Sequence, residues 1–210
     1  DLRTSRGLGD VYKRQVTISA TGLQALTDGA TYTLTADVSD AAGNAAAQVT
    51  SSAFTVDTTA PTVASFTTAT ATGSYNADEA IVITANTSEA IQNGNTITVT
   101  LDTGDTVLLT AASAGTTLVG TYTVGAGDTS AGLTVSSFTI GTVADTAGNA
   151  MTSTTLPSSS SIFGTKTIII DTTAPTVASF TTATASGYYN AGEAIVITAN
   201  TSEAIQNGNT

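Results

Sequence analysis

Carboxylates dominate the chemistry that this sequence can perform. The chain has no Cys and no His, which removes thiolate nucleophiles, the usual general base and the commonest ligands of transition metals. Sixteen Asp and Glu residues stand against five Lys and Arg residues. Carboxylate oxygens are ligands for Ca²⁺, which needs six to eight oxygen atoms gathered from separate loops. Binding of a hard cation is therefore the chemistry to look for.

Several of these carboxylates recur together with the sequence around them. The forty residues at 57–96, which begin DTTAPTV, return at 171–210. Three positions differ, namely Thr72 against Ser186, Ser74 against Tyr188, and Asp78 against Gly192. The period of 114 residues is the length of a whole domain rather than of a solenoid unit.

A shorter motif precedes each copy of DTTAPTV. It reads DAAGNA at 40–45 and DTAGNA at 145–150. The two signals together predict the C-terminal part of one domain at 16–56, a complete domain at 57–170 and the N-terminal third of a further domain at 171–210.

The elements that position these residues are predicted to be short β-strands. In TITVTL at 96–101, apolar side chains alternate with threonines, which is typical of a strand with one buried face. DTGD at 102–105 has the length of a hairpin turn. The other strand-like runs are TVASFTT, AIVITAN, TVLLT, TLVGTYTV, LTVSSFTI and KTIII. We expect an all-β fold of two antiparallel sheets packed as a sandwich.

The segment before residue 57 shows the same alternation. In YTLTADV at 32–38, one face of the strand carries Tyr32, Leu34, Ala36 and Val38. This pattern predicts that their face of the strand is buried.

The chain contains DxAGNA, then a strand and then DTTAPTV, and it is acidic, rich in Thr, Ala and Gly, and without Cys. This combination resembles the tandem bacterial immunoglobulin-like (Ig-like) repeats of large surface adhesins and biofilm-associated proteins. The resemblance covers residues 16–210. It implies stacked Ig-like β-sandwich domains in a secreted, extracellular or cell-surface protein, where they serve as a structural extender without catalytic activity. The implied partners are neighbouring repeats of the same chain, while the host or matrix ligand binds to a domain outside this sequence. DGATY at 28–32 resembles the tyrosine corner of such domains, in which the Tyr hydroxyl closes the preceding turn.

The same family often binds Ca²⁺ where two domains meet, and this implies one candidate calcium site at each junction. In an Ig-like domain alternate loops cluster at each end, so the linker Asp lies between the loops of two domains. The implied ligands at the first junction are Asp28, Asp57, Glu89 and Asp145. Those at the second junction are Glu79, Asp128, Asp171 and Glu203.

These motifs also have a purely structural interpretation. In DxAGN the Asp side chain can cap backbone amides while the Gly adopts a positive φ, and in DTTAP the Pro can fix φ before the first strand. A linker needs no carboxylate at Asp57 or Asp171, whereas a metal site does. Both interpretations stay open at this point.

A catalytic carboxylate pair of the glycosidase type is disfavoured. Asp78 and Glu79 are adjacent, so on a strand they point to opposite faces, and the second copy has Gly192 in place of Asp78. An enzyme rarely needs its active site once per repeat. The alternative to an extender is therefore an Ig-like spacer or binding module attached to a secreted polysaccharide-acting enzyme.

The first fifteen residues differ from the rest of the chain. They hold four of the five cations, and without them the chain carries a net charge of −13 with Lys166 as its single cation, which excludes nucleic acid as a partner. No apolar run approaches the roughly 20 residues of a membrane helix.

SRGLGDVYKRQ at 5–15 resembles a translated transposase sequencing adapter, so residues 1–15 are interpreted as an artefact that packs poorly.

Overall fold

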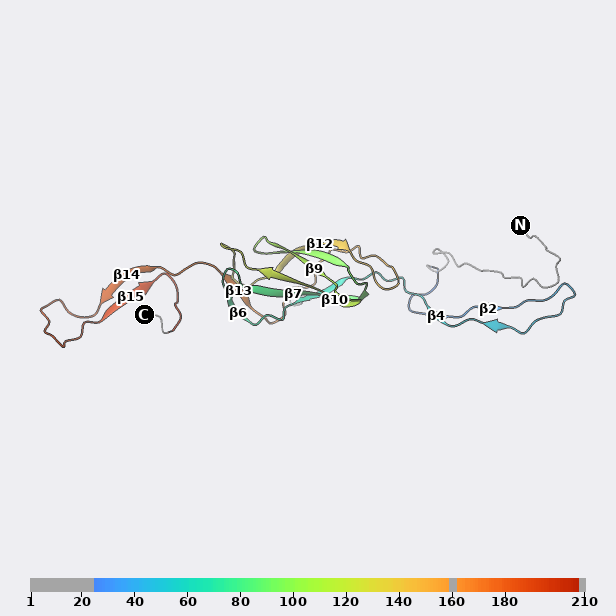
Figure 1. The fold of residues 1–210 in the computed structure, drawn as a ribbon, viewed down its shortest axis with the longest axis horizontal. Helices are drawn as coiled ribbons and strands as arrows, with labels where there is room; N and C mark the ends of the chain where they lie inside the picture. Colours follow the sequence, from blue (N-terminus) through green and yellow to red (C-terminus); the bar gives the residue numbers. More distant parts are fainter. Residues whose placement is uncertain (1–24, 159–161, 208–210) are drawn as a thin grey trace.

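The computed structural model describes residues 25–158 and 162–207, and this part of the chain is all-β. None of the described residues forms a helix long and apolar enough to cross a membrane. The strands fall into three groups that follow one another along the long axis of the molecule (Figure 1). The expected poor packing of residues 1–15 lies outside the described residues.

The central group builds two sheets. Its strands are β5 (Val63–Thr67), β6 (Gly73–Tyr75), β7 (Ala80–Ile91), β8 (Thr96–Leu101), β9 (Thr106–Thr110), β10 (Gly115–Thr123), β11 (Thr129–Ser130), β12 (Val135–Thr142) and β13 (Ile168–Asp171). Six of them form an antiparallel sheet in the order β12-β8-β9-β10-β7-β5, and three form a sheet in the order β11-β13-β6, in which β13 and β6 are parallel.

Side chains from both sheets share one hydrophobic core. Along β8 the side chains of Ile97, Val99 and Leu101 are buried and the threonines between them are partly exposed. Ile168 and Ile170 of β13 join the same core from the second sheet. Phe66 and Phe138 meet edge to face, with ring centroids 5.9 Å apart. The central group is therefore a sandwich-like pair of sheets around one core.

The seven predicted runs all form strands, and the predicted turn at 102–105 joins β8 to β9 as a hairpin. Gly104 in this turn has a φ of 96°, which glycine adopts without steric cost. The structure adds β6 and β11, which the sequence did not indicate. Both are short and polar and carry no alternation.

One glycine within a strand is required by close packing. Gly120 of β10 faces β9, and a Cβ atom there would collide with the carbonyl oxygen of Leu108 and the side chain of Leu109. The absence of a side chain lets β9 and β10 approach each other at this point.

The N-terminal group consists of two short ladders. Its strands are β1 (Thr31–Tyr32), β2 (Thr35–Ala36), β3 (Val49–Thr50) and β4 (Phe54–Thr55), and β1 pairs with β4 while β2 pairs with β3. Tyr32 closes the preceding turn as expected, since its hydroxyl accepts a hydrogen bond from the Thr27 N–H at 2.9 Å.

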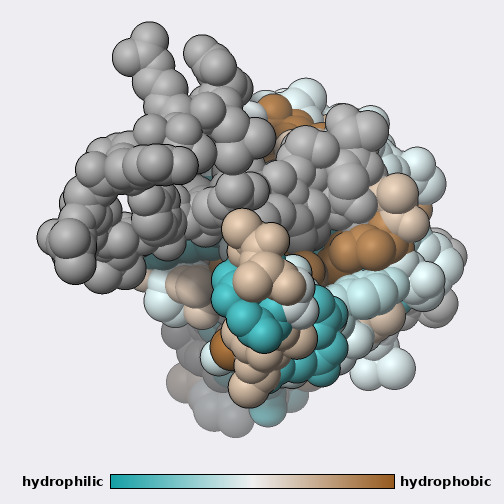
Figure 2. Space-filling view, turned by 90° about the vertical axis from the view of Figure 1, so that its right-hand side faces the viewer, coloured by the Kyte–Doolittle hydropathy of each residue, from teal (hydrophilic) through white to brown (hydrophobic). Residues whose placement is uncertain are grey.

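The prediction of a buried face in this segment is wrong. Leu34 is 45% exposed, Val38 is 64% exposed and Ala36 is also exposed, while Tyr32 is only partly buried. The reason is that no second sheet covers the two ladders within the described residues. Figure 2 shows this end of the molecule, where apolar residues reach the surface among hydrophilic ones.

The C-terminal group is a single pair of strands, β14 (Val177–Thr182) and β15 (Ile197–Thr201). They pair in antiparallel fashion, as β5 and β7 do in the central group. Their apolar side chains are largely exposed, for example Phe180 at 70%.

Candidate metal centre

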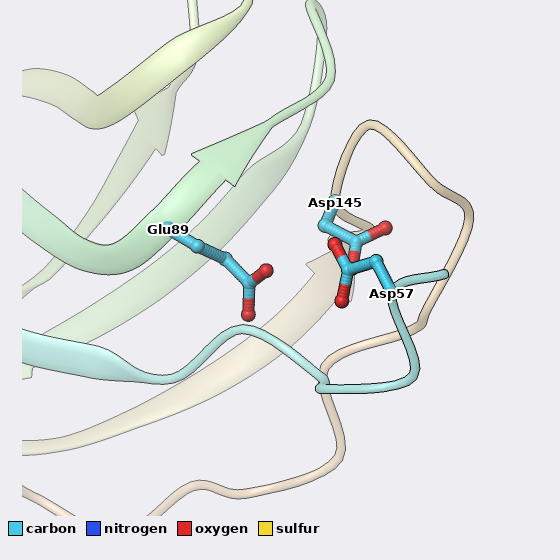
Figure 3. A group of neighbouring side chains, drawn as sticks. All are labelled: Asp57, Glu89 and Asp145. Carbon is cyan, nitrogen blue, oxygen red and sulfur yellow. The ribbon is translucent and has the colours of Figure 1, made fainter. Parts of the chain in front are cut away.

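Three of the candidate ligands come together where the N-terminal segment meets the central group. Asp57 follows β4, Glu89 lies near the end of β7, and Asp145 follows β12. One carboxylate oxygen from each of these residues lies within 4.8 Å of the other two. Figure 3 shows the three side chains pointing toward one another from three different segments. These three acidic residues could hold a metal ion.

Backbone pairing brings Glu89 and Asp145 to the same place. Ile91, at the end of β7, forms a bridge with Asp145. The next residue, Gln92, donates its N–H to the Ala144 carbonyl at 3.0 Å and its Nε2 to the Asp145 carbonyl at 2.8 Å. The end of β7 is thus fixed against the segment that contains Asp145.

Asp145 is held by the DTAGN turn. Its Oδ1 accepts the N–H groups of Gly148 at 2.6 Å and Asn149 at 2.8 Å, and its Oδ2 accepts the Asn149 Nδ2 at 2.7 Å. Gly148 has a φ of 103°. The turn interpretation is therefore confirmed for Asp145, and the same carboxylate also faces the other two acids.

The environment of Asp145 keeps it ionised. Its side chain is 1% exposed, and this burial, the largest single influence, raises the pKa of the carboxyl. The hydrogen bonds from the Asn149 side chain and from the backbone N–H groups of Asn149, Gly148 and Ala147 together outweigh burial, so the pKa of Asp145 is lowered.

Asp40 shows what the same motif does outside the cluster. Its Oδ1 accepts the N–H groups of Ala42 and Asn44, both at 2.9 Å, and its Oδ2 accepts the Asn44 Nδ2 at 2.8 Å. Gly43 has a φ of 93°. Asp40 is exposed and is not part of the acidic cluster, so here the motif acts as a turn.

The carboxylate of Glu89 is the least well satisfied of the three by hydrogen bonds within the described part of the chain. Its Oε1 atom is buried and has no hydrogen-bond partner among the described residues. Burial raises the pKa of Glu89, and the negative charges of Asp57, Asp145 and Asp28 raise it further. A buried carboxylate oxygen without a donor is unfavourable, and a cation between the three acids would satisfy it.

Asn149 connects the linker residue Asp57 to the central group, a role that the sequence analysis did not predict. Its Nδ2 donates to the Asp57 carbonyl at 3.1 Å and lies 3.5 Å from the Asp57 Oδ1. The Asp57 Oδ1 also accepts the Thr59 N–H at 3.1 Å. One amide group thus contacts both Asp145 and Asp57.

Asp28 lies beside the cluster but is engaged differently. Its Oδ1 accepts the N–H and the hydroxyl of Thr58, at 2.6 and 3.1 Å, and its Oδ2 accepts the Thr59 hydroxyl at 2.7 Å. Asp28, Asp57 and Glu89 line the same surface hollow. Asp28 therefore contributes charge near the cluster while its oxygens bind the linker.

The candidate ligands of the second junction are only partly brought together. Asp171, Glu79 and Glu203 line one surface hollow. Asp128 does not line this hollow, and its Oδ2 accepts the Tyr122 hydroxyl and the Gly125 N–H, each at 2.6 Å. Within the described residues, the single group of acids close enough to share one ion is the one at the first junction.

Two features of the second junction match the first. The Oε1 of Glu203 is buried without a hydrogen-bond partner among the described residues, like that of Glu89. The Asp171 Oδ1 accepts the Thr173 N–H at 3.1 Å, as the Asp57 Oδ1 accepts the Thr59 N–H.

No cation of the described residues neutralises the acidic cluster. Lys166 is the single Lys or Arg in the described part of the chain. Its Nζ donates to the carbonyls of Ala69 at 3.3 Å and Thr70 at 2.8 Å, and thereby ties the segment after β5 to the segment before β13.

Comparison of the chain with protein-family models, with curated proteins and with solved structures found no match.

Proposed function

We propose that this chain is a non-catalytic structural extender of a secreted or cell-surface bacterial protein, built from tandem Ig-like sandwich domains that a Ca²⁺ ion stiffens at their junctions. The observation that carries the proposal is the convergence of the linker residue Asp57 with Glu89 and Asp145 of the central group. An ion bound there would join the linker directly to the domain that follows it.

The donor set favours a hard cation. All three groups are carboxylates, and the chain has no Cys or His to hold a softer metal. Ca²⁺ binds oxygen at about 2.3–2.6 Å, so two ligands on opposite sides of one ion lie about 5 Å apart, whereas Mg²⁺ requires shorter distances of about 2.0–2.1 Å. Oxygen atoms that all lie within 4.8 Å of one another can be reached by one Ca²⁺ ion, and titration with both metals distinguishes Ca²⁺ from Mg²⁺.

The extender part of the proposal is supported by the repeat and by the arrangement of the chain. Residues 57–96 return at 171–210 almost unchanged, and the three groups of strands succeed one another along the long axis (Figure 1). The Ig-like class and the extracellular setting rest on the DxAGNA and DTTAPTV motifs, and the sandwich-like core of the central group agrees with them.

The test is metal titration of the full chain and of two matched variants. Isothermal titration calorimetry with Ca²⁺ and Mg²⁺ is combined with small-angle X-ray scattering, with and without chelator. Glu89→Gln removes one ligand of the first junction. Glu203→Gln makes the same change in an identical local sequence outside the group of Asp57, Glu89 and Asp145, and serves as the control.

We expect Ca²⁺ to bind to the wild-type chain and to the Glu203→Gln variant at the first junction, and to stiffen the scattering profile of both. The Glu89→Gln variant should bind at least about tenfold more weakly, since it keeps only two of the three carboxylates. A chain whose scattering and melting temperature are the same in Ca²⁺ and in chelator would refute the metal part of the proposal.

A further inference from the structure

A short loop with the sequence QNGN, at 92–95, connects β7 to β8. Asn-Gly is strongly preferred in two-residue hairpin turns. Here it closes no hairpin, because β7 and β8 are not neighbours in the sheet order β12-β8-β9-β10-β7-β5. Gly94 adopts a φ of 79°, which glycine reaches without steric cost. The Asn-Gly pair of this loop therefore has consequences other than strand pairing.

The two ends of the QNGN loop hold the same segment of the chain. Gln92 donates its N–H to the Ala144 carbonyl at 3.0 Å and its Nε2 to the Asp145 carbonyl at 2.8 Å. Asn95, which is 6% exposed, accepts the Ala144 N–H through its Oδ1 at 2.9 Å. Residues 144–145 are thus held from both ends of the loop, and these contacts depend on the length of backbone between the two ends.

Asn93 and Gly94 form a dipeptide that can deamidate, because glycine has no side chain to obstruct attack by its own backbone nitrogen. The Gly94 nitrogen loses its proton and attacks the Asn93 Cγ, so that a C–N bond forms. The side-chain nitrogen takes up a proton and leaves as ammonia, and water then opens the five-membered succinimide at either carbonyl. The net reaction consumes one water, releases one ammonia and leaves aspartate or isoaspartate at position 93.

The fold keeps the attacking nitrogen in a hydrogen bond. The Gly94 N–H donates to the Ala111 carbonyl at 2.8 Å, and the Ala111 N–H donates to the Asn95 carbonyl at 2.9 Å. While the first of these bonds is closed, the Gly94 nitrogen keeps its proton and cannot attack Asn93. The Asn93 side chain has no hydrogen-bond partner among the described residues. Opening of the Gly94–Ala111 bond is therefore the step that controls the reaction.

We propose that Asn93 is a site of spontaneous deamidation whose rate is set by opening of the Gly94–Ala111 hydrogen bond, and that its isoaspartyl product releases residues 144–145. In isoaspartate the main chain runs through the side chain, so the loop gains one carbon atom and about 1.5 Å of bonded length. Hydrogen bonds weaken steeply when their geometry is disturbed, so the two ends of the loop cannot both keep their contacts.

The released segment leads into the DTAGN turn. Asp145 also forms a bridge with Ile91, directly before the QNGN loop. Deamidation at Asn93 would therefore shift one of the three clustered acids through the backbone. The proposal itself concerns hydrogen bonds within the protein and does not rest on a bound metal.

The first experiment compares two reactions that need the same opened state. Hydrogen exchange of the Gly94 amide and deamidation of Asn93 both require a free Gly94 N–H that can lose its proton, so closure of the bond slows both by the same factor. The sample is the full chain with Asn207→Ser, which leaves Asn93 in the single Asn-Gly of the sequence. Mass spectrometry of peptides gives the deamidation rate, NMR gives the exchange rate, and a peptide of residues 91–97 gives both reference rates.

We expect Asn93 to deamidate at least about tenfold more slowly in the folded chain than in the peptide, and this factor should agree with the exchange protection of the Gly94 amide within about threefold. Deamidation as fast as in the peptide would overturn the proposal, since the hydrogen bond would then not control the reaction. Deamidation far slower than the exchange protection allows would also overturn it, because the opened loop would then not react.

The second experiment compares the product with a matched variant. Isoaspartyl chains are purified by chromatography, identified by fragmentation mass spectrometry and compared with Asn93→Asp, which gains the same charge without the extra main-chain carbon. We expect the Ala144 amide to lose at least about tenfold of its exchange protection in the isoaspartyl chain and to keep it in Asn93→Asp. The Gly104 amide, bonded to the Leu101 carbonyl in the β8–β9 turn, should stay unchanged in both.

Two results of this comparison would overturn the release of residues 144–145. The first is an Ala144 amide that is equally protected in the isoaspartyl chain and in the unmodified chain. The second is an equal loss of protection in Asn93→Asp, because the cause would then be the new charge rather than the longer main chain.

Discussion

The effect of Glu89→Gln on stability should change sign with calcium. Without metal, Glu89 is a partly buried carboxylate next to two others, with no hydrogen-bond partner for its Oε1 among the described residues. Glutamine has nearly the same shape, carries no charge and can donate its amide hydrogens to Asp57 or Asp145. In chelator the variant should therefore be more stable than the wild type.

The size of this effect follows from the distances. One oxygen atom of each carboxylate lies within 4.8 Å of the others, and two unit charges at this upper limit repel each other by about 1 kcal/mol in water and by about 3.5 kcal/mol at an effective dielectric constant of about 20. Asp57 is exposed and Glu89 is only partly buried, so screening places each of the two pairs near the lower figure. Removal of both repulsions yields about 2 kcal/mol, or roughly 10 °C in the Tm of a domain of this size.

Saturating calcium should reverse the order of stability of the wild type and the Glu89→Gln variant. A ligand that binds only the folded state at a thousand times its Kd stabilises that state by about 4 kcal/mol. The wild-type chain gains this stabilisation, and the variant, with one carboxylate less, gains much less. Wild type should then melt above Glu89→Gln.

Differential scanning calorimetry in chelator and in millimolar Ca²⁺ tests the expected order of melting temperatures without and with calcium, and Glu203→Gln is the matched control. The reasoning would be refuted by a Glu89→Gln variant that is less stable than the wild type by the same amount in both buffers. That result would mean that the Glu89 carboxylate stabilises the fold by itself and that metal is irrelevant to it.

Four further outcomes are expected from the same structure. In chelator, the stability advantage of Glu89→Gln over the wild type should grow as the pH rises from about the ordinary Glu pKa of 4.5 through the raised pKa of the folded state. The reason is that the neighbouring acids repel Glu89 only when it is ionised in the folded state. Denaturant titrations at a series of pH values measure this stability difference. Asp78→Gly should stabilise the central group by about 0.5–1 kcal/mol, because Asp78 has a φ of 68° and the second copy already has glycine there, and an unchanged or lower urea midpoint would contradict it. Gly120→Ala should cost about 1–3 kcal/mol in the same assay, because its Cβ would meet the Leu108 carbonyl. Phe66→Ala should lower the free energy of unfolding of the central group by about 3–5 kcal/mol. Phe180→Ala changes a side chain that is 70% exposed, so it should leave that free energy within about 0.5 kcal/mol of the wild-type value.

The strands of the central group could be predicted because apolar and polar residues alternate along each long strand and thereby indicate its buried face. TITVTL places Ile97, Val99 and Leu101 inward, and no other period fits those residues. The pairing of β6 with β13 could not be predicted in this way. It joins Gly73 to Ile168 in parallel, across about half of the chain, and the short polar strand GSY carries no alternation that would reveal its partner.

The acidic site was partly predictable for a similar reason. Asp57 and Asp145 belong to motifs that recur, and Glu89 recurs within the repeat, so their sequence context marked them. The contact of Asn149 with Asp57 could not be predicted, because it depends on how the linker folds back. Asp128 was assigned to the second junction through the resemblance to Ig-like repeats, but its Oδ2 accepts hydrogen bonds from the Tyr122 hydroxyl and the Gly125 amide.

The junctions are held by contacts that do not need a metal, and this limits what calcium can add. At the first junction, Thr58 and Thr59 both donate to the Asp28 carboxylate. At the second, the Thr172 hydroxyl donates to the Asp128 carbonyl at 3.0 Å and accepts the Gly127 N–H at 3.1 Å.

The threonines of DTT thus contact the preceding segment, while Asp57 faces the following one. These hydrogen bonds are exposed to solvent, which weakens even those to the Asp28 carboxylate, and each contributes on the order of 1 kcal/mol, so they orient the linker without making it rigid. Calcium bound to Asp57, Glu89 and Asp145 would then restrict a joint that is already formed. Chelation should therefore widen the range of interdomain angles rather than detach the segments, and replacement of Asp28 by Asn should widen it further at the first junction alone.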